Sequence, residues 1–115
     1  MNNSATLQSA PTTPAPSPTV IFEAIVKRQA VTATYNRGEV VLAPHMIFTK
    51  HDEIYIDAVT VERDGKPPRE EKLGQFKLAG LVGLRITPRR FVPSALFDPT
   101  DEKYGGNALM AVERG

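Results

Sequence analysis

The chain contains no cysteine among its 115 residues. This absence excludes a disulfide framework, a zinc site with thiolate ligands and a cysteine nucleophile, and it suits the reducing environment of the cytoplasm. No stretch approaches the run of about 18 apolar residues that a membrane-spanning helix needs. The N-terminus also lacks the basic and apolar regions of a secretory signal. We therefore expect a cytoplasmic protein that has no membrane partner.

Strong net charge is also missing. The formal net charge is +1, with 41% hydrophobic and 23% charged residues. These values are ordinary for one globular domain, and the chain is too short for two. A balance this mild does not indicate a nucleic-acid partner by itself, so any such partner must be argued from where the charges lie.

The two ends of the chain lack the composition of a folded core. The first 19 residues contain no charged side chain, four prolines and mostly Ser, Thr, Ala and Asn. Such a segment cannot bury enough apolar surface to offset the entropy lost on ordering, so we predict a disordered arm at residues 1–19. Residues 98–115 read as a loop-like tail, within which residues 108–112 could form a short docked segment. The ordered domain is then residues 20–97.

Within this domain, local patterns predict one helix followed by strands. Ser17 before Pro18 is typical of a helix N-cap with proline at the first helical position. After Gln29 the period changes to alternation, which predicts half-buried strands. The first three predicted strands cover residues 31–36, 39–50 and 54–62. Pro44 removes a backbone donor from the second of these, so that strand should lie at an edge, or be bulged or bent there.

The fourth predicted strand contains the stretch LGQFKLAGLVGLRI, residues 73–86. Strict alternation assigns its even-numbered residues from Phe76 to Ile86 to the core. Lys77 and Arg85 then point outward on the same side, provided that Gly80 or Gly83 introduces no bulge. Several short antiparallel strands after one helix indicate a mainly β protein, built as a small barrel or a partly open barrel.

The order of charges suggests a binding surface. No acidic residue occurs between residues 72 and 97, whereas that stretch holds five cations. They are Lys72, Lys77, Arg85, Arg89 and Arg90. Guanidinium and ammonium groups gathered on one face could receive phosphates. The competing interpretation is a solvated face whose positive charge is balanced by acids elsewhere in the fold.

Other polar residues give weaker indications. His45 could bind an anionic ligand, although a histidine satisfied by a backbone carbonyl is more common. Tyr35 and Tyr55 could offer stacking surface to a base, or they could be half-buried packing residues. His45 and His51 lack the further ligands that a zinc site needs, so we expect no metal. No nucleophile motif, glycine-rich phosphate loop or second positioned carboxylate is present, so we expect neither an enzyme nor a cofactor.

The order of these features resembles the WYL domain family of bacteria over roughly residues 20–97. The matching segments run IFEAI, VTATY, a V-x-L-x-P-H strand, EIYIDAV, a turn, FKLAGL and RFVPSALF. The tripeptide that names the family corresponds to Ile54, Tyr55 and Ile56, and its phenylalanine-arginine-leucine strand corresponds to residues 76–78. Its proline corresponds to Pro44. No single motif is specific, and the resemblance depends on the order of them all.

The resemblance implies a small Sm-like β-barrel of about five antiparallel strands preceded by one short helix. Such domains act as sensing modules, usually attached to a helix-turn-helix in transcriptional regulators, and bind negatively charged ligands such as nucleic acids or nucleotides in a basic groove. By this analogy Tyr35, His45 and Lys77 line the site. To these the alternation adds Arg85, and the charge order adds Arg89 and Arg90.

The chain departs from the family pattern at the arginines expected to hold the ligand. One falls at Val40 and another at Gly80, and Ala79 replaces the usual aspartate. The domain therefore either binds a different ligand through its remaining cations or has kept the barrel without the pocket.

Two hypotheses of function follow. The first is a non-catalytic regulatory module that binds a nucleotide or single-stranded nucleic acid on a basic face. The alternative is a module for protein-protein interaction or self-association, in which an exposed strand edge around Pro44 pairs with a protein partner or a second copy.

Overall fold

The computed structural model describes residues 17–114, which form one short helix and six strands. The predicted arm at residues 1–19 therefore lies outside the described residues, except for its last three. The elements follow in the order α1 (Pro18–Lys27), β2 (Gln29–Tyr35), β3 (Gly38–Lys50), β4 (Glu53–Arg63), β5 (Leu73–Lys77), the 3₁₀ turn η2 (Leu78–Gly80), β6 (Val82–Arg90), the 3₁₀ turn η3 (Glu102–Tyr104) and β7 (Ala108–Ala111).

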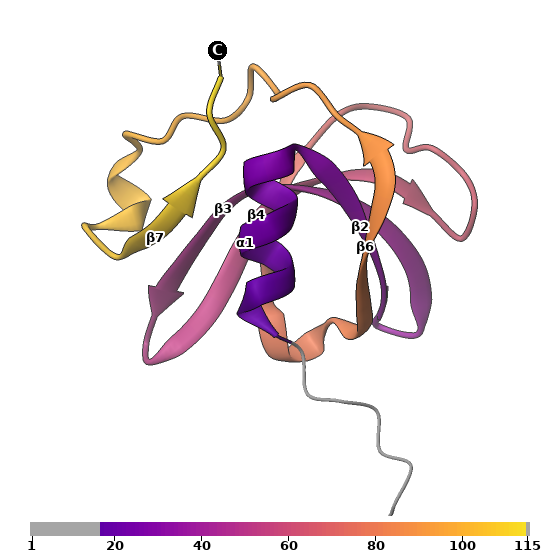
Figure 1. Cartoon of the computed structure of the whole chain (residues 1–115), viewed down its shortest axis with the longest axis horizontal. Helices are drawn as coiled ribbons and strands as arrows, with labels where there is room; N and C mark the ends of the chain where they lie inside the picture. The colour runs from indigo at the N-terminus through magenta and orange to yellow at the C-terminus, as the bar shows by residue number, and fades with distance from the viewer. Residues whose placement is uncertain (1–16, 115) are drawn as a thin grey trace, which may run out of the picture.

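The helix begins where the sequence predicts. The side chain of Ser17 accepts a hydrogen bond from the backbone N–H of Thr19, and Pro18 occupies the first helical position. The helix ends at Lys27, and the left-handed backbone of the capping residue Arg28 (φ 54°) turns the chain into β2. One face of α1 is buried and packs on the sheet, and its buried residues are Ile21, Ala24 and Ile25. Figure 1 shows α1 lying across the sheet between β7 and β6.

All six strands pair antiparallel, which confirms the mainly β fold. The strand order is β5-β4-β3-β2-β6, and β7 pairs with β3 outside this path. Among the described residues, the end strands β5 and β6 do not pair with each other, so the sheet is open rather than closed. The closed form of the barrel expected from the sequence is therefore unconfirmed.

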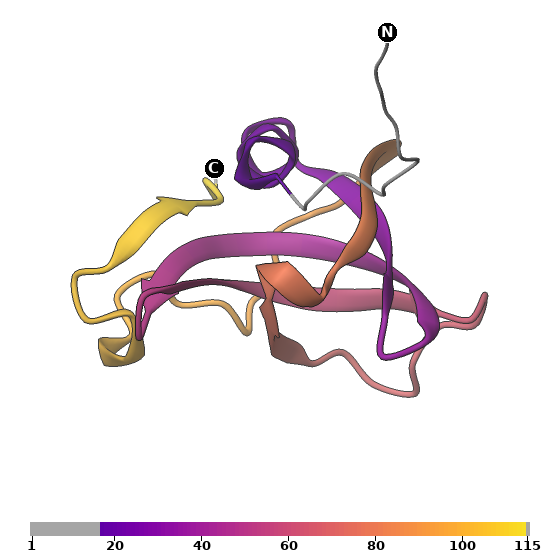
Figure 2. The same ribbon diagram turned by 90° about the horizontal axis from the view of Figure 1, so that it is seen from below.

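The open sheet nevertheless curls strongly. The rings of Tyr35 in β2 and Phe76 in β5 lie 5.1 Å apart, although β3 and β4 separate these strands in the sheet. Arg89 in β6 forms an ion pair of 2.9 Å with Glu62 in β4, again across two intervening strands. A flat sheet could not bring such residues together, because neighbouring strands are about 4.8 Å apart. Figure 2, in which α1 is seen nearly end on, shows β6 crossing out of the layer formed by β3 and β4.

A bulge at Pro44 and His45 allows β3 to change its partner. On one side β3 pairs with β2 over residues 38–42 and with β7 over residues 46–48. On its other side, the register with β4 shifts between Pro44 and Met46. The expectation of a bulge at Pro44 is confirmed. An exposed edge there is not present, since Pro44 is buried in a strand with neighbours on both sides.

The predicted fourth strand is two strands at opposite ends of the sheet. The chain leaves β5 at Lys77, turns through η2 and enters β6 at Val82. The alternation predicted for residues 73–86 fails at this turn: Leu81 is fully buried and Val82 is 49% exposed. Gly80 permits the turn because a Cβ there would approach the Tyr35 ring to 3.1 Å. Lys77 and Arg85 thus lie on opposite end strands and not on one common face.

The segment after β6 completes the core. Phe97 is fully buried, and Tyr104 and Val112 are nearly so. The docked segment expected around residues 108–112 is the strand β7, which pairs with β3. Much of the tail expected to be loop-like is therefore packed against the sheet, and we call residues 91–114 the C-terminal strap.

We expect Phe97→Ala to lower the free energy of unfolding by about 3–5 kcal/mol, because it removes a fully buried ring and leaves a cavity. Val92→Ala is a matched control in the same strap, since Val92 is 86% exposed. The control should change stability by no more than about 0.5 kcal/mol. Urea unfolding followed by circular dichroism measures both, and equal stability of the two variants would contradict the proposed role of the strap in the core.

Candidate functional site

The six predicted site residues do not form a single surface. Tyr35 lies close enough to Lys77 to contribute to the raised pKa of that lysine, Arg85 lines a groove elsewhere, His45 is buried, and Arg89 and Arg90 lie toward the end of β6. The structure also brings two residues beside Lys77: Tyr55, which the sequence indicated as a possible stacking surface, and Lys50, which the sequence did not single out.

The first cluster centres on Tyr55. The Nζ atom of Lys50 lies 5.8 Å from the centre of the Tyr55 ring, and that of Lys77 lies 6.0 Å from it. Both distances are within the range of a cation–π interaction. The ring also stacks on the buried Phe48 at 6.1 Å, which fixes its orientation. We call Lys50, Tyr55 and Lys77 the Tyr–Lys face.

Lys77 is held in place by an exposed ion pair. Its Nζ atom donates to Glu53 at 3.2 Å, and both side chains are nearly half exposed. This hydrogen bond and the charge of Glu53 raise the pKa of Lys77, with smaller contributions from Tyr55 and Tyr35. Lys77 therefore remains charged near neutral pH. Because exposed ion pairs contribute little stability, an anionic ligand can compete with Glu53 for this ammonium group.

Tyr35 is a packing residue at the border of this face. Its ring meets Phe76 edge to face at 5.1 Å and lies against the backbone of Gly80. The sequence left two roles open for these tyrosines, packing and the stacking of a base. Tyr35 is a half-buried packing residue, whereas Tyr55 offers an aromatic surface beside two cations.

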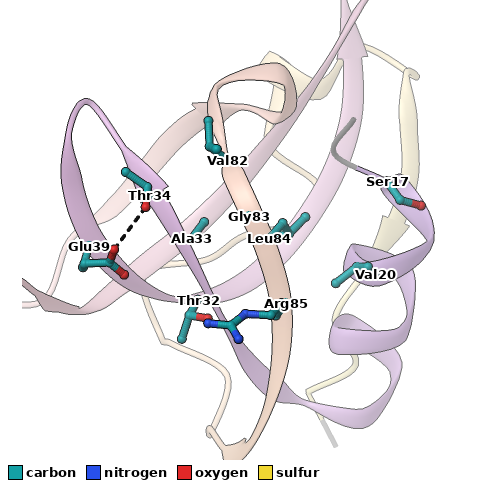
Figure 3. Close-up of a pocket in the computed structure, with 10 residues that line it drawn as sticks. All are labelled: Ser17, Val20, Thr32, Ala33, Thr34, Glu39, Val82, Gly83, Leu84 and Arg85. Atoms are coloured by element: carbon teal, nitrogen blue, oxygen red, sulfur yellow. Dashed lines mark hydrogen bonds between the residues drawn. The ribbon is translucent and has the colours of Figure 1, made fainter. Parts of the chain in front are cut away.

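Arg85 lines a separate groove of about 480 Å³ between the start of α1, β2 and the first half of β6. Figure 3 shows its guanidinium group running toward Thr32, which is its direct register partner on β2. Within residues 17–114, Arg85 has no ion pair and donates no side-chain hydrogen bond. We call this the Arg85 groove.

His45 is a structural residue and not part of an open site. It is 1% exposed, and its ring contacts two backbone groups. Nδ1 donates to the carbonyl of Ala43 at 2.8 Å, and Nε2 accepts the N–H of Ser94 at 2.8 Å. Because a backbone N–H can only donate, Nε2 must be unprotonated and the ring neutral. The alternative raised by the sequence, a histidine satisfied by a backbone carbonyl, matches this geometry.

The basic face expected from residues 72–97 is broken up by acids from other elements. Arg89 pairs with Glu62, Lys77 with Glu53, and Lys72 lies 3.8 Å from a carboxylate oxygen of Glu70. Arg90 is exposed at the end of β6. Since β5 and β6 are the two ends of the sheet, the cations divide between them. This geometry favours the second of the two interpretations of these cations, a solvated surface whose positive charge is balanced by acids elsewhere in the fold, over a single basic binding face.

The sequence identified Asp57 as a carboxylate that could support an acid-base role, but it gave no sign of the contact that this residue makes with the strap. Asp57 is fully buried, and its Oδ2 accepts from the Tyr104 hydroxyl at 2.6 Å and forms an ion pair of 2.6 Å with Lys103 Nζ. Burial, followed by the hydrogen bond and charge of Asp57, raises the pKa of Tyr104, so the hydroxyl stays protonated and donates. No local signal could have revealed this contact, because Tyr104 lies in a stretch that the sequence presents as loop.

Two further classes of site are missing from the described part of the chain. Residues 17–114 contain no group of three or more His, Asp or Glu side chains placed to hold a metal ion. None of the helices formed by these residues is long and apolar enough to cross a membrane.

We expect the stability of the protein to fall on mild acidification because of His45. Burial lowers the pKa of this ring below its ordinary value of 6.5, outweighing the hydrogen bond to Ala43 and the charges of Glu71 and Asp57, and Arg114 lowers it further. The unfolded chain therefore binds more protons as the pH falls below about 6.5, and the free energy of unfolding decreases there by at most about 1.4 kcal/mol per pH unit. Well above that pH the His45 ring is neutral in both the folded and the unfolded chain, so it adds nothing to the dependence of the free energy of unfolding on pH.

Urea unfolding between about pH 5.5 and 7.5 tests this, since most carboxylates do not titrate in that window. His45→Gln should flatten the slope, whatever its effect on overall stability. His51→Gln, which alters the exposed histidine, should leave the slope unchanged. An unaltered slope in His45→Gln would assign the acid sensitivity to another group.

Comparison of the chain with protein-family models, with curated proteins and with solved structures finds no match. The resemblance to the WYL family therefore stays a prediction, and the function must be argued from the geometry of the site.

Proposed function

We propose that the protein is a non-catalytic, WYL-like regulatory module of the cytoplasm that binds a nucleotide or single-stranded nucleic acid on the Tyr–Lys face. The observation that carries the proposal is the position of two lysine ammonium groups within about 6 Å of one partly exposed tyrosine ring. This is a combination suited to bases and phosphates together.

The chemistry of single strands matches this surface. Proteins that bind single-stranded nucleic acid combine cations that follow the phosphates with aromatic rings on which bases stack. In this proposal a base stacks at Tyr55, and Lys50 and Lys77 receive the flanking phosphates. The buried ring of Phe48 stacks on the Tyr55 ring, so the Tyr55 ring is already oriented before the ligand binds.

The curled sheet supports the WYL-like part of the proposal. One short helix precedes antiparallel strands, and contacts such as Arg89–Glu62 connect strands that are not neighbours. We describe this as a partly open, Sm-like barrel. In such a fold the turn η2 connects the two end strands and places Gly80 beside Tyr35, at the border of the proposed site.

The proposal is tested by fluorescence anisotropy of a labelled oligothymidylate of about 15 nucleotides. Binding should weaken steeply between about 50 and 200 mM salt, because each neutralised phosphate releases counterions. Tyr55→Leu should weaken binding by about 1–3 kcal/mol, the usual contribution of one stacked base. The double variant Lys50→Gln, Lys77→Gln should also reduce the dependence of binding on salt.

A double variant that removes two exposed cations elsewhere, Lys66→Gln, Arg90→Gln, is the matched control for net charge. It should bind nearly as well as the natural chain at the same salt concentration. If it loses as much affinity as the variant of Lys50 and Lys77, the binding is non-specific attraction to positive charge, and the Tyr–Lys face is not the site. Thermal melting of each variant separates loss of binding from loss of folding.

A second candidate function rests on a different observation, the two unpaired ends of the sheet. Within the described residues, β5 and β6 each pair on one side only, so each presents a row of backbone groups able to accept another strand. The alternative function, self-association or protein binding through a strand edge, therefore remains a proposal. The edge that would pair is that of β5 or β6, and not the one expected around Pro44.

Edge pairing predicts a mass above that of the monomer in sedimentation equilibrium. The association should be nearly the same at roughly 50 and 500 mM salt, since backbone hydrogen bonds are not screened as exposed charges are. Val82→Lys should reduce the mass to that of a monomer, because a lysine on an edge strand opposes pairing. A monomer at all protein concentrations would exclude self-association by this route.

A further inference from the structure

We propose that the Arg85 groove is a binding site for a small zwitterion with an aliphatic side chain, a free amino acid or a short peptide, whose carboxylate binds Arg85 and whose ammonium group binds Glu39. This site is separate from the Tyr–Lys face and does not depend on the function proposed for that face. Its volume of about 480 Å³ lies in the usual range for small-molecule pockets, about 300–1,000 Å³.

The groove contains one charge of each sign. Of the described residues that line it, only Arg85 and Glu39 are ionisable. They flank the same face of β2: Thr32 pairs with Arg85 on one side, and Thr34 pairs with Glu39 on the other. Because residues two apart on a strand share a face, both side chains lie over the same surface of β2. Figure 3 shows Arg85 extending over this surface toward Thr32, with the Glu39 carboxylate beside Thr34.

The two charges do not neutralise each other. Ordinary strand spacing separates their Cα atoms by about 12 Å, and no ion pair between them is formed. A free guanidinium group presents a fork of donors that matches a carboxylate. A ligand with an anionic and a cationic end can therefore fill the space between them and pair with both.

Glu39 is fixed in position before any ligand binds. Its Oε2 accepts from the Thr34 hydroxyl at 3.1 Å. Its backbone N–H donates to Asp64 Oδ1 at 3.0 Å, and its carbonyl accepts the N–H of Asp64 at 2.7 Å. The first contact orients the carboxylate and the other two hold the backbone that carries it, which reduces the entropy that the site would lose on binding a small ligand.

The groove also has an apolar surface, the exposed side chain of Val82, on which the aliphatic part of the ligand can pack. Val82 pairs with Thr34 in the same row as Glu39, and it is 49% exposed. The register between β2 and β6 shifts next to it, where Gly83 adopts a left-handed backbone (φ 67°) and a Cβ would meet no heavy atom within 4 Å. This bulge leaves the groove open beside Val82. An aliphatic side chain lying there would remove apolar surface from water.

The charge pattern also selects against the ligand class proposed for the Tyr–Lys face. The groove holds one acid for its one cation, whereas the Tyr–Lys face holds two lysines for one glutamate, so only that face has the excess positive charge that a phosphate needs. A zwitterion satisfies both groups. The Arg85 groove is therefore better suited to an amino acid than to a nucleotide.

Nuclear magnetic resonance titration of the full chain tests the site with three probes. L-leucine carries both charges, 4-methylpentanoate lacks the ammonium group, and 3-methylbutylamine lacks the carboxylate. Leucine should shift the amide signals of Thr32, Thr34 and Gly83 and bind at least about tenfold more tightly than either analogue, since each loses one charge-assisted contact. Leucylleucine distinguishes a free amino acid from a peptide as the better ligand.

Arg85→Gln and Glu39→Gln should each weaken leucine binding by at least about tenfold. Arg90→Gln, on the same strand but outside the groove, and Glu23→Gln, on the exposed face of α1, are the matched controls and should bind leucine as the natural chain does. The proposal is overturned if leucine shifts none of these signals, or if 4-methylpentanoate binds as tightly as leucine. Neither result bears on oligonucleotide binding at the Tyr–Lys face.

Discussion

The bulge at Pro44 and His45 is the constraint on which the rest of the fold depends. It sits in β3, a strand that contacts three others, at the point where β3 exchanges β2 for β7. Proline supplies no N–H there, and the histidine ring uses its two nitrogens to replace ladder contacts with bonds to Ala43 and Ser94. Through the second bond the bulge also holds the C-terminal strap, whose side chains close the core.

Local chemistry made part of this fold predictable. The Ser17–Pro18 pair located the start of the helix, and alternation located the first three strands. The glycines at 80 and 83 marked where the alternation could be interrupted, but no local signal showed that the chain would leave one end of the sheet there and enter the other. At the break the Tyr35 ring lies so close to Gly80 that a Cβ would approach it to 3.1 Å, and these residues are 45 positions apart in the chain. The turn at this point carries the chain from β5 to β6, so Arg85 lies at the opposite end of the sheet from Lys77.

The candidate sites were less predictable than the fold for a related reason. Whether a cation is available depends on the acids that the fold places beside it, and these come from distant segments, as Glu62 does for Arg89. The stretch without acids between residues 72 and 97 therefore produced two surfaces of different chemistry. One joins lysines to a tyrosine ring, and the other sets a single arginine opposite a single glutamate.

The order in which the core is filled along the chain has a consequence for synthesis. Phe97, Tyr104 and Val112 complete a core whose other members lie mostly before residue 60, and the pairing of β7 with β3 connects residues 60 to 65 positions apart. Contacts so distant in sequence form slowly, because the intervening chain must first lose its freedom. During synthesis, residues 46–48 of β3 therefore lack their β7 partner until residues 108–111 have been made, and an unpaired strand edge of this kind is prone to aggregation.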